Sequence, residues 1–147
     1  REYGLGSLYP SDSRQAALSD QWMTWSTDSF MGTFFPVFWQ LVRTKESERD
    51  YDKIAKMAKK SSDILRILEG HLINNHFVAG KELTYGDIPL GVLLHKYFVL
   101  DIERPSLPGI EAWYGRLRER EAFQEHAMQP FGNSPEEFLE LQRLGEQ

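Results

Sequence analysis

Residues 83–88, with the sequence Leu-Thr-Tyr-Gly-Asp-Ile, contain a complete start signal for a helix. Thr84 stands at the N-cap position, where its hydroxyl can accept the backbone N–H of Asp87 while the Asp87 carboxylate accepts the N–H of Thr84. Leu83 and Ile88 occupy the two positions of a hydrophobic staple. Such a cap contributes roughly 1 kcal/mol, and it matters most where the helix end is buried and no water can bond it.

The helix that follows this capping box is predicted to lie in the centre of the fold. Residues 88–100 read Ile-Pro-Leu-Gly-Val-Leu-Leu-His-Lys-Tyr-Phe-Val-Leu, which is apolar on nearly every side. A helix of this kind is covered by other elements on all its faces. His95, within the run, is interpreted as a core histidine with a satisfied hydrogen bond. The sequence therefore predicts a bundle built around one buried, capped helix.

A long first helix is predicted before it. Residues 11–13 offer N-caps, and the helical pattern continues to about Arg43. Pro36 lacks an N–H for the carbonyl of Gly32 and would crowd it, so we expect a bend between these two residues.

The other helices follow from caps and apolar spacing. Ser47 and Asp50 have the spacing of a second capping box, and Gly70 predicts fraying near His71 because glycine costs about 1 kcal/mol relative to alanine in a helix. Three shorter helices are expected at 110–119, around 123–127 and from Ser134 onward. The seam of the second helix comprises Tyr51, Ile54, Ala58, Ser61, Leu65, Leu68 and Leu72. No alternating apolar pattern predicts a strand, so the predicted class is all-α with five to six helices.

Composition excludes several classes of function. The net charge of −5 argues against a nucleic-acid surface, which needs clustered lysine and arginine. No apolar stretch approaches the roughly 18 residues that span a membrane, and the absence of a signal peptide makes the cytoplasm the default location. The chain has no cysteine, so it holds no disulfide and no thiol nucleophile. His71 and His76 are five apart, a spacing unsuited to two ligands on one helix face, and no metal site is predicted.

The candidate binding surface is an aromatic and hydroxyl-rich stripe on the first helix. Rings supply apolar contact for a hydrophobic ligand, while hydroxyls can orient it by hydrogen bonds. Spacings of three and four place Trp22, Trp25, Ser29 and Thr33 along one line, with Ser26, Phe30 and Phe34 beside it, and we call these seven residues the stripe. The competing interpretation, held equally open, is that Phe30, Phe34 and Phe38 face the core and that the two tryptophans pack on another domain. Further along, Trp39 and Arg43 have the spacing of a structural cation–π pair.

Taken in order, these segments resemble the C-terminal helical domain of the glutathione transferase family. The capping box with its apolar run resembles the start of the family's central helix, and residues 77–80, Phe-Val-Ala-Gly, fit the same pattern. Residues 22–25 and 38–44 resemble the first long helix of a bacterial branch of the family. Residues 104–108, followed by 113–117, resemble a later helix.

The resemblance implies a division of labour with a domain that this chain lacks. In the family, a thioredoxin-like domain binds glutathione and carries the catalytic Ser, Tyr or Cys, so no catalytic residue is assigned here. We expect residues 1–10 to be a linker remnant, residues 11–147 to be the helical domain, and the chain to be a fragment or processed product. The resemblance further implies glutathione as co-substrate, a small hydrophobic electrophile as acceptor, detoxification as the role, and a homodimer.

The sequence is also compatible with two functions of other classes. Similar helical domains serve as non-catalytic docking modules on translation factors and synthetases, and a large apolar face would be their mark. The third hypothesis is a domain that binds hydrophobic ligands in the aromatic cleft without chemistry.

Overall fold

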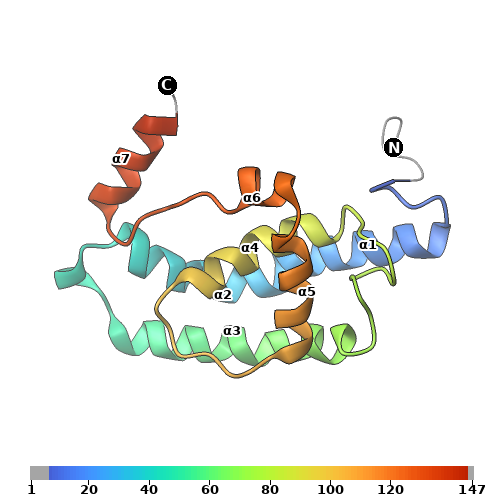
Figure 1. Cartoon of the computed structure of the whole chain (residues 1–147). Coiled ribbons are helices and arrows are strands. Elements are labelled where there is room, and N and C mark those ends of the chain that lie inside the picture. The colour runs from blue at the N-terminus through green and yellow to red at the C-terminus, as the bar shows by residue number, and fades with distance from the viewer. Residues whose placement is uncertain (1–6, 146–147) are drawn as a thin grey trace.

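Helices form the regular structure of residues 7–145, the part of the chain that this computed structural model describes (Figure 1). That part contains no β-strand, and the predicted all-α class is confirmed. The elements are α1 (Ser13–Trp25), the π-helical turn η1 (Ser26–Phe30), α2 (Met31–Phe38), the π-helical turn η2 (Trp39–Arg43), the 3-10 turn η3 (Glu46–Glu48), α3 (Tyr51–Leu72), α4 (Asp87–Val99), α5 (Pro108–Arg118), α6 (Glu121–Ala127) and α7 (Pro135–Gly145). The helical path is unbroken from Ser13 to Arg43, so α1, η1, α2 and η2 form one long first helix. With the five α-helices that follow it, the described residues contain six helices, within the predicted five to six.

The long first helix begins at the predicted cap. The Asp12 carboxylate accepts the N–H of Gln15 at 2.9 Å, which satisfies one free donor of the first turn of α1. Pro36 stays within α2. The departures from α-helical hydrogen bonding lie on either side of α2, in the π-helical turns η1 and η2.

The second long helix, α3, starts later than the sequence pattern indicated. Ser47 lies in the 3-10 turn η3, and the cap is Asp50, whose carboxylate accepts the N–H of Lys53 at 2.9 Å. The helix continues past Gly70 and ends at Leu72, one residue beyond His71, and the fraying expected there stays a prediction. The His71 ring is held in place by a 2.9 Å hydrogen bond between its Nε2 and the carbonyl of Val78. The predicted seam is buried except for Tyr51, which is 56% exposed.

Helix α4 is the buried centre of the bundle, as predicted. It crosses the middle of the molecule between the long first helix and α5, with α3 along the lower edge in Figure 1. Its residues Leu90, Leu94 and Tyr97 have no exposed surface. The ends of the apolar run are less covered, because Ile88 is 39% and Val99 54% exposed.

The capping box at the start of α4 is present, but one of its two predicted hydrogen bonds is replaced by others. The Asp87 carboxylate accepts the N–H of Thr84 at 2.9 Å as predicted. The Thr84 hydroxyl, however, donates to this carboxylate at 3.1 Å and accepts from the Ser19 hydroxyl at 2.9 Å, while the N–H of Asp87 bonds the Thr84 carbonyl. The predicted acceptance by the Thr84 hydroxyl was wrong, because a neighbouring helix competes for that oxygen. Only Leu83 of the predicted staple packs against the core.

Two further caps fix the later helices. Helix α5 is capped in trans by Glu69 of α3, whose carboxylate accepts the N–H groups of Gly109 and Ile110, each at 2.9 Å. Helix α7 starts at the predicted Ser134, whose hydroxyl accepts the N–H of Glu137 at 3.2 Å. No residue of α7 is buried, and the helix projects from the body of the bundle (Figure 1).

The part of the predicted linker that the structure describes packs on the start of α4. The N–H of Tyr85 donates to the carbonyl of Leu8 at 3.0 Å, and the rings of Tyr9 and Tyr85 are stacked with centroids 5.2 Å apart. Residues 1–6 lie outside the described residues.

Candidate functional site

The predicted stripe on the first helix faces mainly inward. Trp25 and Ser29 are half-buried and are the two members of the stripe with substantial accessible surface. The buried members are Trp22, Ser26, Phe30, Thr33 and Phe34. The structure therefore favours the interpretation in which Phe30, Phe34 and Phe38 face the core, and any direct contact with a ligand falls to Trp25 and Ser29.

Two of the three stripe hydroxyls are engaged by the helix itself. Ser26 donates to the carbonyl of Met23 at 2.7 Å, and Thr33 donates to the carbonyl of Phe30 at 3.0 Å. Hydroxyls that return a bond to their own helix satisfy a local acceptor and are turned away from solvent. Ser29 is the stripe hydroxyl that remains accessible at the surface.

The rings of the stripe form one continuous series of contacts, edge to face between Trp22 and Trp25 and stacked from Trp25 through Phe30 to Phe34. Centroid separations are 5.3 Å for Trp22–Trp25, 6.5 Å for Trp25–Phe30 and 5.3 Å for Phe30–Phe34. Tyr97 of α4 meets the last two of these rings edge-on, at 5.9 and 5.8 Å. Such ring pairs are worth about 0.5–1.5 kcal/mol beyond the area they bury. Trp25 is thus a partly accessible ring in contact with the buried rings of Trp22 and Phe30.

The π-helical turn explains why the regular spacing misplaced several side chains. In η1 the N–H of Met31 bonds the carbonyl of Ser26, five residues back. Each such turn takes in one residue more than an α-turn, so positions after it rotate around the helix axis relative to positions before it. Residues 22–25 and 33–34 consequently do not continue one straight stripe, and spacing alone gives no sign of this.

A second aromatic cluster, which we call the η2 cluster, lies at the end of α2. Its rings are Phe35, Phe38, Trp39, Phe131 and Phe138, with the cations Arg43 and Lys96 over them. The predicted cation–π pair is confirmed, since the Arg43 guanidinium carbon lies 5.7 Å from the Trp39 ring centroid. Phe35 is 42% and Trp39 48% exposed, which the sequence pattern did not indicate. Burial lowers the pKa of the Lys96 ammonium.

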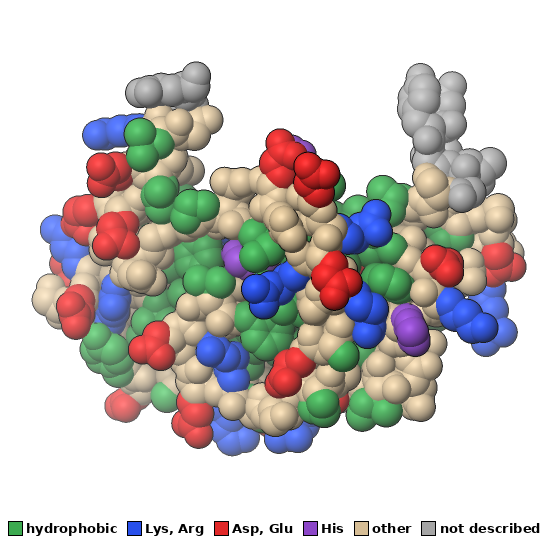
Figure 2. Space-filling model, viewed as in Figure 1, with side chains coloured by type: hydrophobic (Ala, Val, Ile, Leu, Met, Phe, Trp, Pro, Cys, Tyr) green, Lys and Arg blue, Asp and Glu red, His purple; other side chains and the backbone are tan. Residues whose placement is uncertain are grey.

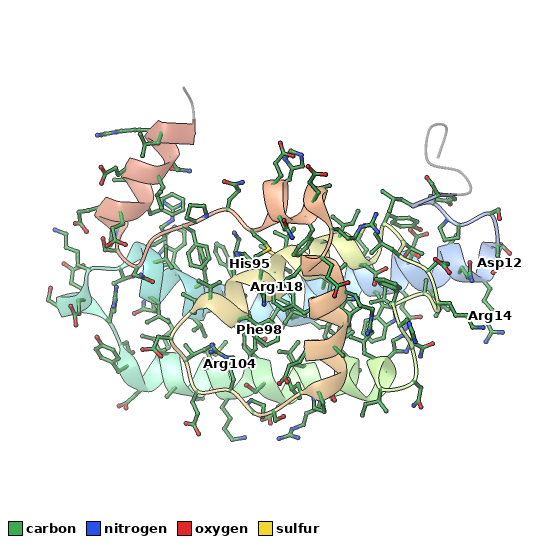
Figure 3. The ribbon with its side chains drawn as sticks, in the orientation of Figure 1. Asp12, Arg14, His95, Phe98, Arg104 and Arg118 are labelled. Atoms are coloured by element: carbon green, nitrogen blue, oxygen red, sulfur yellow. The ribbon has the colours of Figure 1, made fainter. Side chains whose placement is uncertain are left out.

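His95 and Tyr114 form a buried polar pair between α4 and α5. The Nδ1 atom of His95 and the Tyr114 hydroxyl are 2.7 Å apart, which confirms the predicted core histidine with a satisfied bond. Burial lowers the pKa of His95, and the charges of Lys96 and Arg118 lower it further. His95, on α4, and Arg118, on α5, lie near one another on the face shown in Figure 3.

Asp87 is the most heavily bonded side chain of the core. Besides Thr84, its carboxylate accepts the N–H of Val78 at 2.9 Å and the indole N–H of Trp113 at 2.8 Å. Burial raises the pKa of Asp87, and these hydrogen bonds oppose the increase. The bond from Trp113 joins α4 to α5, and the bond from Ser19 to Thr84 joins α1 to the same site. The capping box is therefore also the point at which three helices are tied together.

Within residues 7–145, no helix is long and apolar enough to cross a membrane. In the same range, no three His, Cys, Asp or Glu side chains gather in a way that would hold a metal ion.

An all-helical bundle around a central helix capped by a buried Thr–Asp pair is a fold of the glutathione transferase C-terminal domain type. A family model of the glutathione S-transferase C-terminal domain matches residues 30–121. The chain therefore belongs to the glutathione S-transferase C-terminal domain family.

Individual relatives agree with this assignment. The glutathione S-transferase GstB of Escherichia coli (strain K12) is 26% identical over 129 residues, which are 88% of this chain and 62% of the relative. The theta class glutathione S-transferase of Xanthomonas axonopodis pv. citri, solved with glutathione bound, is 41% identical with a TM-score of 0.82, over 85% of this chain and 65% of that one. A glutathione S-transferase from Pseudomonas fluorescens, 24% identical with a TM-score of 0.67 over 79% and 58% of the two chains, shares the fold. The chain thus spans less than two thirds of the length of these relatives.

Proposed function

We propose that this chain is the acceptor-binding and dimer-forming domain of a glutathione transferase that adds the glutathione thiolate to hydrophobic electrophiles, in a detoxifying role. The observation that carries the proposal is the likeness to a transferase solved with glutathione bound, at 41% identity, combined with an accessible ring and hydroxyl on the first helix. The cytoplasmic location expected from the sequence remains a prediction.

In this proposal the chain contributes orientation. Glutathione is bound mainly by a preceding domain, where its thiol is activated by a lowered pKa. Trp25 then provides an apolar wall for the acceptor, and the Ser29 hydroxyl, one turn further along, bonds a polar group of the acceptor or the thiolate. Holding two reactants in the correct geometry is worth up to about 7–11 kcal/mol of barrier. The contacts of Trp25 with the buried rings of Trp22 and Phe30 support that role.

The test is steady-state conjugation by the natural two-domain protein, with an aryl chloride as acceptor. Trp25→Ala is expected to raise the KM for the acceptor about tenfold and to leave the KM for glutathione within twofold. Thr24→Ala is the matched control, since Thr24 is exposed one position away on the same helix, and it is expected to change neither constant. Turnover by the 147-residue chain alone would refute the division of labour, because this chain has no group to activate a thiol in the proposal.

One observation favours a second candidate function, a non-catalytic docking module. Phe35 and Trp39 of the η2 cluster are large exposed rings side by side, with centroids 5.8 Å apart. Exposed apolar patches on a soluble protein often mark interfaces. A full-length protein that is inactive with glutathione, yet loses a bound protein partner on Trp39→Ser, would favour docking over transfer. A dimer that dissociates on the same substitution, with activity retained, would assign the patch to the homodimer instead.

A further inference from the structure

A groove of about 740 Å³ lies between α3 and the loop that follows α4. One wall consists of α3 residues between Tyr51 and Arg66, both buried and exposed, and the other is the loop segment 101–105. None of the residues of the predicted aromatic stripe lines it. A volume of this size is typical of sites that bind small organic molecules, which occupy about 300–1,000 Å³.

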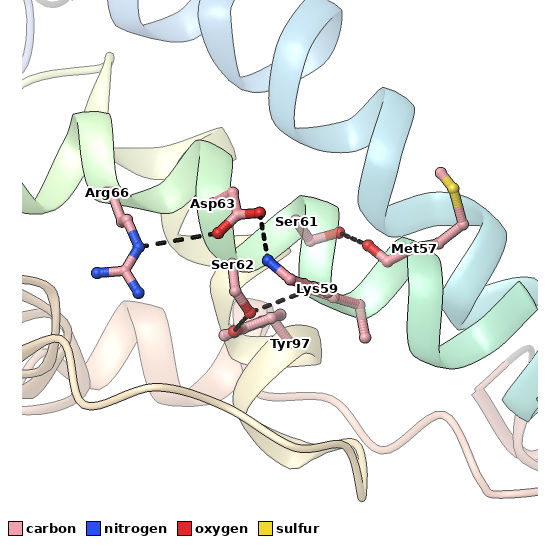
Figure 4. Close-up of polar contacts among 8 residues, drawn as sticks. Met57, Lys59, Ser61, Ser62, Asp63, Arg66 and Tyr97 are labelled. Carbon is pink, nitrogen blue, oxygen red and sulfur yellow. Dashed lines mark hydrogen bonds and ion pairs between the residues drawn. The ribbon is translucent and has the colours of Figure 1, made fainter. Parts of the chain in front are cut away.

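Small and apolar side chains create the space in the groove. Ile54 and Ala58 of α3 and Ile102 of the loop form its apolar part, and Ala55 leaves room on the outer wall. The buried Ser62 completes the lining. Its hydroxyl donates to the carbonyl of Ala58 at 3.0 Å and lies 3.0 Å from the Tyr97 hydroxyl (Figure 4). The polar atom beneath the groove is therefore satisfied within the protein, and the apolar surface is what a ligand would cover.

The charged side chains on the α3 wall are unbalanced in favour of cations. Lys56, Lys59 and Arg66 share this wall with one carboxylate, Asp63, which is 3.0 Å from the Lys59 ammonium and 3.8 Å from the Arg66 guanidinium (Figure 4). A single carboxylate cannot neutralise three cations. Charged side chains of both signs lie along this lower edge of the molecule, where α3 runs (Figure 2). The excess of positive charge runs against the net charge of −5 of the whole chain.

The loop wall narrows the class of ligand. The Arg104 guanidinium donates to the carbonyls of Tyr97 and Leu100, neutral acceptors that leave its charge in place. Asp101 and Glu103 stand on the same wall and would repel a polyanion. Nucleic acid and polyphosphates are therefore disfavoured, and the α3 wall, with its excess of positive charge, favours a ligand that has a single anionic group.

We propose that this groove binds a small amphipathic carboxylate, with the carboxylate at Lys56 and Lys59 and the apolar body over Ile54, Ala58 and Ile102. The proposal does not depend on transferase activity. An aryl-alkyl acid fits both features, because its ring covers the apolar lining and its single charge meets the cationic wall.

The test uses the 147-residue chain, labelled with ¹⁵N and titrated with 4-phenylbutyrate while backbone amide shifts are followed. Saturable shifts are expected in residues 51–66 and 101–105. Lys56→Glu and, separately, Ala55→Trp, which fills the groove, are each expected to weaken binding at least tenfold. The matched controls are Lys60→Glu, which makes the same charge change at an exposed position of α3 outside the groove, and Ala17→Trp, at an exposed position of α1. Both controls should bind within twofold of the wild type.

A neutral analogue separates charge from hydrophobicity. 4-Phenylbutyramide, which has a similar shape but no charge, is expected to bind at least tenfold more weakly. Equal binding of acid and amide would overturn the proposal, as would shifts confined to the η2 cluster or equal weakening by Lys56→Glu and Lys60→Glu. Amide spectra of each variant, recorded without ligand, report whether it is folded.

Discussion

The Asp87 side chain offers the sharpest test of how this fold is held together. It is fully buried and accepts from the N–H groups of Val78 and Thr84 and from the indole of Trp113. Asp87→Ala leaves these three donors without a partner, and each buried unsatisfied donor costs about 1–3 kcal/mol. With partial relaxation we expect a loss of about 3–6 kcal/mol, a large share of the 5–15 kcal/mol typical of a domain.

Asp87→Asn refines this prediction, because the amide is nearly isosteric with the carboxylate. One carboxylate oxygen serves Val78 and Trp113, and the other serves Thr84. Asparagine keeps one acceptor oxygen for the first pair and turns its NH₂ toward the Thr84 N–H, so the expected loss is about 1–3 kcal/mol. Urea unfolding followed by circular dichroism measures both variants. Asp101→Ala, at an exposed loop position, should stay within about 0.5 kcal/mol of the wild type. A loss below 1 kcal/mol for Asp87→Ala would refute the reasoning.

Three further predictions concern packing, pH and capping. Gly91→Ala should destabilise the fold by about 1–3 kcal/mol, because its Cβ would lie 2.6 Å from a leucine side chain of α5. Gly115→Ala, whose Cβ would enter open space, should stabilise the fold by up to about 1 kcal/mol. Thermal unfolding measures the sign of both changes. The pKa of His95 is lower in the folded state, so His95 contributes to the free energy of unfolding above the unfolded pKa near 6.5, and this contribution is lost as the pH falls below that value. Urea titrations at pH 7 and pH 5 should therefore show a smaller loss of stability in His95→Gln than in the wild type. The exposed His126→Gln should show the same loss as the wild type. Glu69→Ala should cost about 0.5–2 kcal/mol, because two N–H groups in the first turn of α5 lose their acceptor, and amide exchange in that turn should accelerate.

The fold could be predicted from the sequence where local signals were strong and agreed with burial. Asp12 and Ser134 cap their helices as their residue types indicated, and the apolar run behind Asp87 occupies the centre of the bundle. Interactions between distant segments could not be predicted in this way. The cap that Glu69 provides for Gly109 joins residues 40 positions apart, and the hydrogen bond from the Ser19 hydroxyl to the Thr84 hydroxyl joins residues 65 positions apart. No local sequence pattern indicates either contact.

The candidate site was harder to predict because helical spacing assumes a uniform helix. The π-helical turn from Ser26 to Phe30 changes which side chains share a face. Within the predicted stripe, Trp25 and Ser29 remain partly accessible and the other members are buried. The sequence pattern likewise gave no sign that Phe35 and Trp39 would be exposed together. The amount of ring surface could be anticipated from composition, but its orientation depends on hydrogen bonding in the first helix.

The central proposal is that this chain is the helical part of a longer transferase, and the most direct test is the intact mass of the native protein. An antibody raised against this chain would capture the protein from its source cells for mass spectrometry. We expect a mass well above 17.1 kDa, by about the size of one domain, in keeping with the 62–65% of relatives that the chain spans. A native mass near 17.1 kDa would contradict the claim and favour the docking or ligand-binding functions instead.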